Sequence, residues 1–473
     1  MAWRDNVVTP DAWLGRGEAV CNDAQPPMAV WQGIPGERCH VHVYAPGNNR
    51  DHARWEKPVA GPSRYRVTPP CERYSVCGGC PWMHVNPAGQ TRARLELTHE
   101  AYARYDLQEH APKELRASPD GMLGYRHLMK LAVGSSDRGQ TRVGAFGRST
   151  RNVVPIPNCM VLASGLRETM RLVAHNVIEQ DIWPWDPEKN RGVLRYVVVR
   201  QSRSTGTQLV TLVGARKSPK YRDLAEALVQ KSGLIAGVHM HINGSPGNAL
   251  FEPSEDGGIA TVRLEGDRTI EEHVAGLRLP IGAGDFFQTN PAVAELLIRD
   301  LEEWLPAKRA VVDLYSGVGG LTLAAARRTG WALGVESVET AVNRARGAAS
   351  LNGLPAEFIA GEVLEELPEI GRRLAGRPPV VIVNPARRGL EPGVVESIRD
   401  LSPSRLIYIS CNPATQARDI AALSERGFAL HHSMAYDMFP NTPHVEVMAV
   451  LSGPSAGDKG RKRPPRRKVV RSS

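Results

Sequence analysis

The 473-residue sequence has no run of about 20 apolar residues, the length that a helix needs to cross a bilayer, although 42% of its residues are hydrophobic. Its first thirty residues carry Asp5, Asp11, Glu18 and Asp23, and they lack the apolar stretch of a secretory signal peptide. No internal repeat is apparent. These absences predict a cytoplasmic protein without a membrane partner, and the length is sufficient for about three domains.

A disulfide framework is not expected either. The seven cysteines are odd in number, and Cys71, Cys77 and Cys80 are crowded into one short segment. Crowded cysteines in a chain without a secretory signal indicate a metal site rather than disulfide bonds. Four thiolates can bind either Zn²⁺ or an iron–sulfur cluster, and the spacing alone does not separate the two.

Acidic residues are scarce at the C-terminal end. Residues 455–473 contain eight Lys or Arg and one Asp, so this segment carries +7 of the net charge of +9. Its composition predicts a disordered tail. The tail either keeps the protein soluble or contacts the phosphates of a nucleic acid, so the charge supports an RNA partner without establishing one.

The order of the expected elements predicts three domains before this tail. Residues 1–62 alternate in short strands with turn signals, as in a small β-barrel of the OB type. Residues 63–275 mix strands with helices in an α+β pattern. Residues 276–454 alternate apolar strands with helices, which predicts a Rossmann-like α/β fold.

Three apolar runs of the last domain, at 311–314, 380–383 and 406–409, each end in a polar or glycine-rich turn. They are typical of buried parallel strands, and ligands of such sheets bind beyond the carboxyl ends of the strands. Cys411 follows the third run directly. The sequence therefore places a thiol in a ligand-binding crevice.

The turn after the first of these strands is suited to a nucleotide-like cofactor. Gly317 and Gly319 allow close approach of a ligand to the backbone, and Glu336 ends the next strand, where a carboxylate can accept both ribose hydroxyls. The full G-x-G-x-x-G fingerprint is absent because position 322 is Thr. The shortened loop and the cysteine favour S-adenosylmethionine (SAM) over NAD.

The motifs of this domain resemble those of the RNA uracil-C5 methyltransferase family, and the resemblance extends over nearly the whole chain. They read DLYSGVGG from Asp313, NPARRG from Asn384, SCNPATQARD from Ser410 and FPNTPHVE from Phe439. The resemblance implies that Cys411 is the nucleophile and Glu446 the base, that Asn384 and Arg387 lie beside the target base, and that SAM contacts Gln288, Tyr315, Gly317, Gly319, Glu336 and Asn384. Two positions depart from the family pattern, Gly320 where Asn is common and Asn384-Pro385-Ala386-Arg387 for Asp-Pro-Pro-Arg.

The first two domains extend the resemblance. Residues 1–62 are similar to the TRAM domain, an RNA-binding barrel, and Cys71, Cys77, Cys80 and Cys159 match the family's [4Fe–4S] pattern, with Zn²⁺ as the alternative. Both features are typical of the branch that methylates ribosomal RNA of the large subunit, and transfer RNA is the alternative substrate. A cytosine-C5 enzyme is disfavoured, because its usual cysteine is missing after residue 383. The alternative of another class is a non-catalytic RNA-binding or assembly factor. No obligate protein partner is implied.

Overall fold

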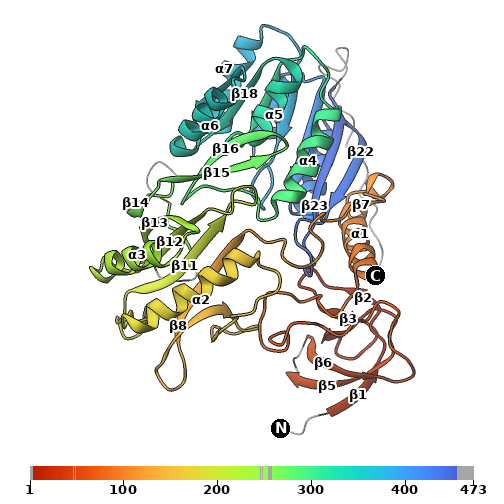
Figure 1. Ribbon diagram of the computed structural model, residues 1–473. Helices are drawn as coiled ribbons and strands as arrows, with labels where there is room; N and C mark the ends of the chain where they lie inside the picture. Colours follow the sequence, from red (N-terminus) through yellow and green to blue (C-terminus); the bar gives the residue numbers. More distant parts are fainter. Residues whose placement is uncertain are drawn as a thin grey trace.

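The computed structural model describes residues 4–45, 47, 49–245, 247, 249–253 and 258–454, and the expected basic tail lies outside them. Within these residues no helix is both long and apolar enough to span a membrane. Figure 1 shows three parts: a small β-rich unit at the N-terminal end, a central α+β unit and a larger α/β unit that holds the C-terminal half.

The N-terminal unit is a curved six-stranded sheet in the order β1-β5-β6-β4-β3-β2, with β4 and β6 parallel and the other pairs antiparallel. Its core consists of inward-facing residues such as Val30, Val41 and Ala53, which are fully buried. The alternation of apolar and polar residues along β5 explains this one-sided burial. The strands are β1 (Arg4–Val8), β2 (Ala12–Trp13), β3 (Ala19–Cys21), β4 (Met28–Trp31), β5 (Cys39–Ala45) and β6 (Asp51–Pro58).

The central unit is a seven-stranded sheet in the order β10-β9-β8-β11-β12-β13-β14, and two helices pack against it. The helices bury apolar residues at helical spacing, for example Leu166, Met170 and Val173 in the first of them. The elements are β8 (Leu128–Ser135), β9 (Thr141–Phe146), β10 (Val153–Val154), α2 (Ser164–Glu179), β11 (Leu194–Gln201), β12 (Gln208–Gly214), α3 (Lys220–Lys231), β13 (Ile235–Ile242) and β14 (Val262–Gly266).

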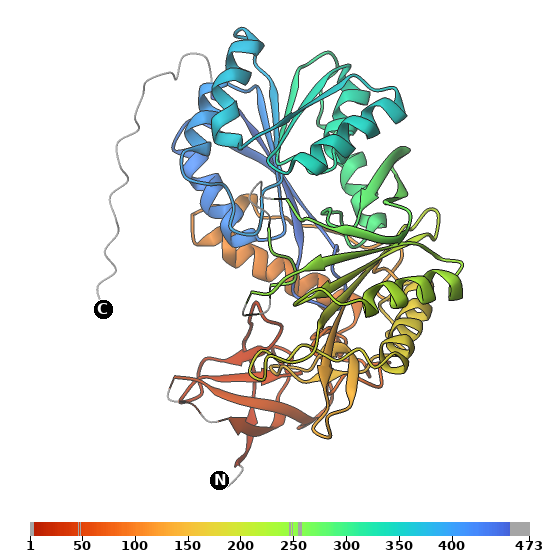
Figure 2. The ribbon, with the colours of Figure 1, turned by 90° about the vertical axis from the view of Figure 1, so that its left-hand side faces the viewer.

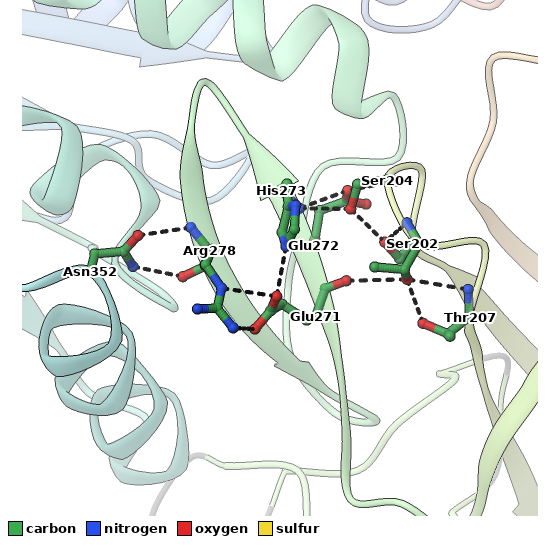
Figure 3. Close-up of polar contacts among 9 residues, drawn as sticks. Ser202, Ser204, Thr207, Glu271, Glu272, His273, Arg278 and Asn352 are labelled. Carbon is green, nitrogen blue, oxygen red and sulfur yellow. Dashed lines mark hydrogen bonds and ion pairs between the residues drawn. The ribbon is translucent and has the colours of Figure 1, made fainter.

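A two-stranded hairpin, β15 (Thr269–Val274) and β16 (Leu277–Gly282), joins the central unit to the C-terminal one. Figure 3 shows its polar contacts in both directions. The Glu272 carboxylate accepts hydrogen bonds from the backbone N–H groups of Arg203 (2.7 Å) and Ser204 (3.2 Å), on the loop between β11 and β12. On the other side, Arg278 and Asn352 exchange two hydrogen bonds of 2.9 and 2.8 Å. The hairpin is therefore anchored to both units.

The C-terminal unit confirms the Rossmann-like methyltransferase fold. Its eight-stranded sheet has the order β19-β18-β17-β20-β21-β23-β22-β7; the first five strands are parallel, and β23 is antiparallel to both of its neighbours. The strands are β17 (Val311–Leu314), β18 (Ala332–Glu336), β19 (Ala356–Ala360), β20 (Val380–Val383), β21 (Arg405–Ser410), β22 (Ala429–Tyr436) and β23 (Glu446–Ser452).

Helices cover the parallel strands of this sheet, as runs such as Val380–Val383, buried along their whole length, require. The first helix begins as its sequence predicts, because the Asn290 side chain accepts a hydrogen bond from the N–H of Val293 and Pro291 opens the first turn. The helices are α4 (Pro291–Glu303), α5 (Gly320–Thr329), α6 (Glu339–Asn352), α7 (Val363–Leu374), α8 (Val394–Asp400) and α9 (Pro413–Ser424).

One segment from the first third of the chain belongs in space to the C-terminal unit. Helix α1 (Pro87–Ala103) packs against α9, and after the short helix η1 (Gln108–His110) strand β7 (Leu115–Arg116) pairs with β22 at the edge of the eight-stranded sheet. Figure 2 shows the orange α1 lying against the blue C-terminal strands. The expected domain 63–275 is continuous in the sequence, but in the structure residues 87–116 pack with the C-terminal unit.

Candidate active site

Cys411 and Glu446 meet at one end of the eight-stranded sheet. Ser410, the last residue of β21, pairs with Val447 of the antiparallel strand β23. Cys411 follows Ser410 and Glu446 precedes Val447, so the two residues lie at the same end of this strand pair. Asn412 then turns the chain into α9: its side chain accepts a hydrogen bond from the N–H of Ala414 (3.3 Å). The two residues that the motifs single out are therefore brought together by strand pairing.

The electrostatics of this pair are unusual. Glu446 is only 2% exposed, and burial raises the pKa of its carboxyl to about 8. Burial and the neighbouring Glu446 also raise the pKa of the Cys411 thiol, whereas Arg387, which hydrogen-bonds to the thiol, lowers it. A thiol and a buried carboxyl, both with raised pKa values, therefore share the site with one guanidinium.

Arg387 comes from the loop that follows β20. Its carbonyl accepts hydrogen bonds from the side chains of Asn412 (2.9 Å) and Thr415 (3.1 Å), which hold this loop against the start of α9. Its guanidinium also donates to Nδ1 of His444 (3.0 Å), and burial together with the nearby arginines lowers the pKa of His444 to about 4. His444 is therefore neutral, and its place in the site is that of an acceptor that orients Arg387.

The loop at 439–445, which leads into Glu446, is held by groups from α1. The side chain of Arg94 is fully buried and donates hydrogen bonds to the carbonyls of Phe439 (3.2 Å), Thr442 (3.1 Å) and His444 (3.1 Å). Asp437, whose carboxylate lies 3.2 Å from Arg94, supplies its counter-charge. A buried arginine with backbone acceptors and a carboxylate is rigidly placed, so it fixes the path of the loop.

Further contacts to this loop come from the region around the cysteines. The Tyr125 hydroxyl donates to the carbonyl of Pro440 (3.0 Å), and the backbone N–H of Trp82 donates to the carbonyl of Asn441 (3.0 Å). Asn441 itself has φ +66°, a left-handed conformation, and its N–H donates to the Gln90 side chain (2.9 Å). The interpretation of the sequence missed Gln90, Arg94 and Tyr125, because none of them lies in the motifs that carry the chemistry.

The cofactor loop lies between β17 and α5. Tyr315, Gly317 and Gly319 have φ values of +67°, +54° and +88°, so the backbone turns sharply here. A Cβ on Gly319 would lie 2.9 Å from the ring of Phe358, so only glycine fits. The Glu336 carboxylate reaches across from β18 and accepts a hydrogen bond from the N–H of Gly317 (2.9 Å). The predicted loop and its acid are therefore in contact.

Several polar groups around this loop are buried without a partner. In the described part of the chain, the Tyr315 hydroxyl, the Ser316 hydroxyl and Oδ1 of Asp313 have no hydrogen bond. The Asn384 carboxamide, which follows the neighbouring strand β20, is only half-buried, and it has no hydrogen-bond partner among the described residues. Buried polar atoms are normally satisfied, so these groups fit a polar ligand such as SAM.

Gln288 comes from a different segment of the chain. It lies half-buried in the loop between β16 and α4, beside Arg200, whose guanidinium donates to the carbonyls of Asp285 (2.8 Å) and Phe287 (3.4 Å). Among the described residues, no hydrogen bond joins the Gln288 side chain to Tyr315 or Glu336. Its expected role toward the cofactor stays a prediction.

The four predicted metal-binding cysteines line one cavity. Cys71, Cys77, Cys80 and Cys159 surround a space of about 220 Å³ together with apolar residues such as Met83. None of these four thiols forms a disulfide. Across the described residues, no three His, Cys, Asp or Glu side chains gather closely enough to bind a single metal ion.

Two arginines of the central unit, Arg195 and Arg200, have a role that the sequence did not indicate. From the sequence, these arginines could either contact RNA phosphates or line a solvated face. In the structure, Arg195 donates to the carbonyls of Asn243 (2.6 Å) and Ser245 (3.1 Å), and Arg200 donates to the carbonyl of Asp285 in the loop before α4 (2.8 Å). Both guanidiniums are internal braces of the fold.

Comparison with known proteins agrees with this geometry. The family model described as tRNA (Uracil-5-)-methyltransferase matches residues 376–453, a stretch that includes Cys411 and Glu446. An uncharacterized RNA methyltransferase of Geobacter sulfurreducens is 32% identical, over 88% of this chain and 84% of its own, and one of Synechocystis is 30% identical, over 92% and 93%.

A solved structure is similar over nearly the whole chain. The Pyrococcus abyssi tRNA (uracil-54, C5)-methyltransferase in complex with S-adenosyl-L-homocysteine has a TM-score of 0.73 at 25% identity, and the match covers 94% of this chain and 100% of that one. The similarity therefore includes the N-terminal regions as well as the Rossmann-like sheet.

Proposed function

Because this chain belongs to the RNA uracil-C5 methyltransferase family and is a SAM-dependent RNA methyltransferase, we propose that it methylates C5 of a uridine through a covalent bond between Cys411 and C6. The observation that carries the proposal is the convergence of Cys411, Glu446 and Arg387 at the ends of β21, β23 and β20. A thiol, a buried carboxyl and a guanidinium supply the nucleophile, the base and the charge that this reaction needs.

The nucleophilic step belongs to Cys411. C5 of uracil is too weak a nucleophile to take a methyl group unaided, and addition of the Cys411 thiolate to C6 turns the ring into an enolate that is rich in electrons at C5. Arg387 stabilises the thiolate through its hydrogen bond to the sulfur. When bound, SAM supplies the methyl group from its sulfonium centre.

Glu446 completes the reaction. Its carboxylate takes the proton from C5, the electrons of that C–H bond reform the double bond between C5 and C6, and the Cys411 sulfur leaves as a thiolate. A carboxyl with a pKa of about 8 accepts a proton far more readily than an exposed one. Once the sulfur is bound to C6 it carries no charge, so it does not repel the Glu446 carboxylate.

Recognition of the base is the role that we assign to Asn384 and Arg387. The free Asn384 carboxamide can accept from N3–H of uracil and donate to its O4, whereas a carboxylate can do only the first. Leaving one buried polar group unpaired costs about 1–3 kcal/mol, roughly 5- to 150-fold in rate. Asn384→Leu should therefore lose most activity on uridine, and Asn384→Asp should retain it.

For the four cysteines we propose a [4Fe–4S] cluster rather than zinc. Thiolates on one zinc ion lie about 2.3 Å from it, and hence within about 4 Å of one another, whereas the larger iron–sulfur cube holds them farther apart. The four cysteines line one cavity of about 220 Å³, and all four positions match the family's iron–sulfur pattern, which supports the cluster. Methyl transfer needs no electron, so the role of the cluster is to shape the region that contacts the loop at 439–445.

The proposed substrate is ribosomal RNA of the large subunit, in the cytoplasm. The β-rich N-terminal unit and the cysteine site, which resemble those of the ribosomal branch, support it. Transfer RNA is the second candidate, because the transfer RNA enzyme of Pyrococcus abyssi is similar over 94% of this chain.

One experiment tests the reaction and the substrate together. In separate reactions, the protein and isotopically labelled SAM are incubated with unmodified ribosomal RNA or with unmodified transfer RNA. The 5-methyluridine formed is then mapped by mass spectrometry. We expect label at C5 of a uridine in ribosomal RNA, none with Cys411→Ala, and a protein–RNA adduct that survives denaturing gels with Glu446→Gln. Turnover by Cys411→Ala would refute the covalent mechanism, and label only in transfer RNA would refute the choice of RNA.

A further inference from the structure

Two of the sequence motifs end on residues that take no part in the proposed reaction. NPARRG ends at Gly389, and SCNPATQARD ends at Asp419. The structure brings these two ends together, because the Asp419 carboxylate accepts a hydrogen bond from the backbone N–H of Leu390 (2.8 Å). Gly389 has φ +82°, and an added Cβ would collide with the Asp419 carboxylate, so only glycine fits at this position. The ends of the two motifs therefore form one contact.

Asp419 is well suited to hold a loop in place. It lies in the middle of α9 with only 4% of its surface exposed. Besides the N–H of Leu390, its carboxylate accepts hydrogen bonds from the hydroxyl of Tyr408 on β21 (2.7 Å) and from the guanidinium of Arg418 (2.8 Å). Hydrogen bonds to an ionised carboxylate are stronger than those between neutral groups. Asp419 thus ties the loop at 384–390 to both the helix and the sheet.

Other side chains at the start of α9 hold the same loop. Asn412 and Thr415 both donate to the carbonyl of Arg387, and Arg418 donates to the carbonyl of Arg388 (2.9 Å). Positions 412, 415, 418 and 419 recur at intervals of three to four residues, so they lie on one face of the helix. This face binds the backbone at positions 387, 388 and 390 in turn, and Asp419 makes the last of these contacts.

Arg387 needs such a hold more than the other groups of the active site. Cys411 and Glu446 lie at the ends of two paired strands, whereas Arg387 is exposed and comes from a loop. Its guanidinium must nevertheless stay hydrogen-bonded to the Cys411 sulfur. A long side chain loses rotamer freedom in such a bond, and the bond weakens steeply when its geometry deteriorates. The backbone that carries Arg387 therefore has to be fixed.

We propose that Asp419 is a positioning residue: it fixes the loop at 384–390 so that the Arg387 guanidinium faces the Cys411 sulfur. The inference rests on the proposed function only in taking Cys411 as the nucleophile. The alternative is that Asp419 ties α9 to β21 and does no more than stabilise the fold. The sign of the effect helps to separate the two. Removing an anion while the loop stays in place favours the thiolate, whereas releasing Arg387 disfavours it.

The test measures the Cys411 thiol without RNA or SAM. The full chain is alkylated with iodoacetamide from about pH 7 to about pH 10.5, and mass spectrometry of the peptide that contains Cys411 gives the rate at this residue alone. The pH dependence yields the apparent pKa of the thiol separately from its accessibility. The variants are Asp419→Ala and Asp419→Asn, with Arg387→Ala as the reference.

A matched control is Asp300→Ala. Asp300 binds the hydroxyl of Tyr436 (2.9 Å) and the guanidinium of Arg116 (3.1 Å), much as Asp419 binds those of Tyr408 and Arg418. It lies in α4, and none of the hydrogen bonds that hold the loop at 384–390 involves it. The control therefore reports the effect of losing a stabilising carboxylate without releasing the loop.

Arg387→Ala removes a hydrogen bond to a charged group, so the apparent pKa of Cys411 should rise by about 1–2 and alkylation at pH 8 should slow about 10- to 100-fold. Asp419→Ala should raise the apparent pKa by about 0.4–1, as expected for a weakened bond. Asp419→Asn should restore most of the loss, because its amide oxygen can still accept from the N–H of Leu390. Asp300→Ala should leave the apparent pKa unchanged.

The double variant Asp419→Ala with Arg387→Ala tests the route of the effect. If Asp419 acts through Arg387, the double variant has the same apparent pKa as Arg387→Ala alone. A further rise in the double variant, or an unchanged or lowered pKa in Asp419→Ala, would overturn the proposal. If Asp419→Ala does not fold, the nearly isosteric Thr415→Val takes its place, because it removes one bond to the carbonyl of Arg387 and should shift the pKa in the same direction. Since no methylation is measured, these outcomes are independent of the proposed reaction.

Discussion

Glu446 should make the protein less stable as the pH rises, because burial raises the pKa of its carboxyl. The pKa is about 8 in the folded chain, against 4.5 for an ordinary Glu, so the folded state holds the proton over a range in which the unfolded state has lost it. A folded-state pKa above the unfolded value stabilises at low pH, and that contribution is lost as the pH rises from the lower to the higher value.

The size of the effect follows from the two pKa values. Between them, stability falls by about 1.4 kcal/mol for each pH unit, which amounts to roughly 3–4 kcal/mol between pH 5 and pH 8. Cys411 adds nothing in this range, because its pKa is raised above the ordinary 9.0 and the thiol stays protonated in both states. The loss therefore reports on Glu446.

Glu446→Gln keeps the shape of the side chain and removes the titration. The melting temperatures of the variant and the wild type should be close at pH 5 and diverge as the pH rises. At about 2–4 °C per kcal/mol for a domain of this size, the variant should gain roughly 7–14 °C on the wild type by pH 8. Differential scanning calorimetry from pH 5 to pH 9 measures this, with the exposed Glu226→Gln as the control for the loss of a surface carboxylate.

The same carboxyl should govern activity. Proton removal from C5 needs the ionised form, so kcat/KM for RNA should rise with pH through about 8 in the wild type. Melting temperatures of wild type and Glu446→Gln that run parallel from pH 5 to pH 9 would refute the buried, neutral carboxyl and, with it, this account of the base.

Tyr125→Phe deletes the hydrogen bond to Pro440, worth about 0.5–1.5 kcal/mol, and keeps the ring. We expect kcat to fall by up to about tenfold while SAM affinity is unchanged. An unaltered kcat in single-turnover assays would show that Tyr125 does not position the loop. Gly320→Asn restores the residue common in the family, at a position where an added Cβ meets only Leu279, at 3.6 Å. It should raise SAM affinity severalfold in calorimetric titration. Equal or weaker binding would show that Gly320 costs the protein no contact with SAM. Anaerobically purified wild type should be brown and contain about four irons and four sulfides per chain, Cys159→Ser should lose most of both, and stoichiometric zinc without sulfide would argue for the other metal.

Local patterns in the sequence were sufficient for much of the catalytic unit. The apolar runs that become β17, β20 and β21, and the Asn–Pro pairs that start α4 and α9, follow from interactions within a few residues, so they are legible in the sequence. The strand end also predicts that Cys411 lies in a crevice. That Glu446 stands beside it was implied by the motif, and the pairing of β21 with β23 is what places it there.

Helix α1 shows why other parts could not be predicted. Its buried face carries Gln90, Arg94 and Thr98 in place of an apolar stripe, because these side chains bind the loop before Glu446 and the backbone of their own helix. Periodicity detects a face that avoids water, not a polar face that is satisfied by partners about 350 residues away. The association of residues 87–116 with the C-terminal sheet was invisible for the same reason.

The arginines make the same distinction at the level of single residues. In the sequence Arg54, Arg94 and Arg195 are equivalent, since each is a cation in a mixed segment. Tertiary structure alone decides that Arg94 and Arg195 are buried against carbonyls while Arg54 stays exposed beside a cavity. What the sequence by itself determined is the chemistry that is available and the local elements that carry it. Which charges are neutralised, and which are left for a ligand, depends on contacts between distant segments, and those exist only in the folded chain.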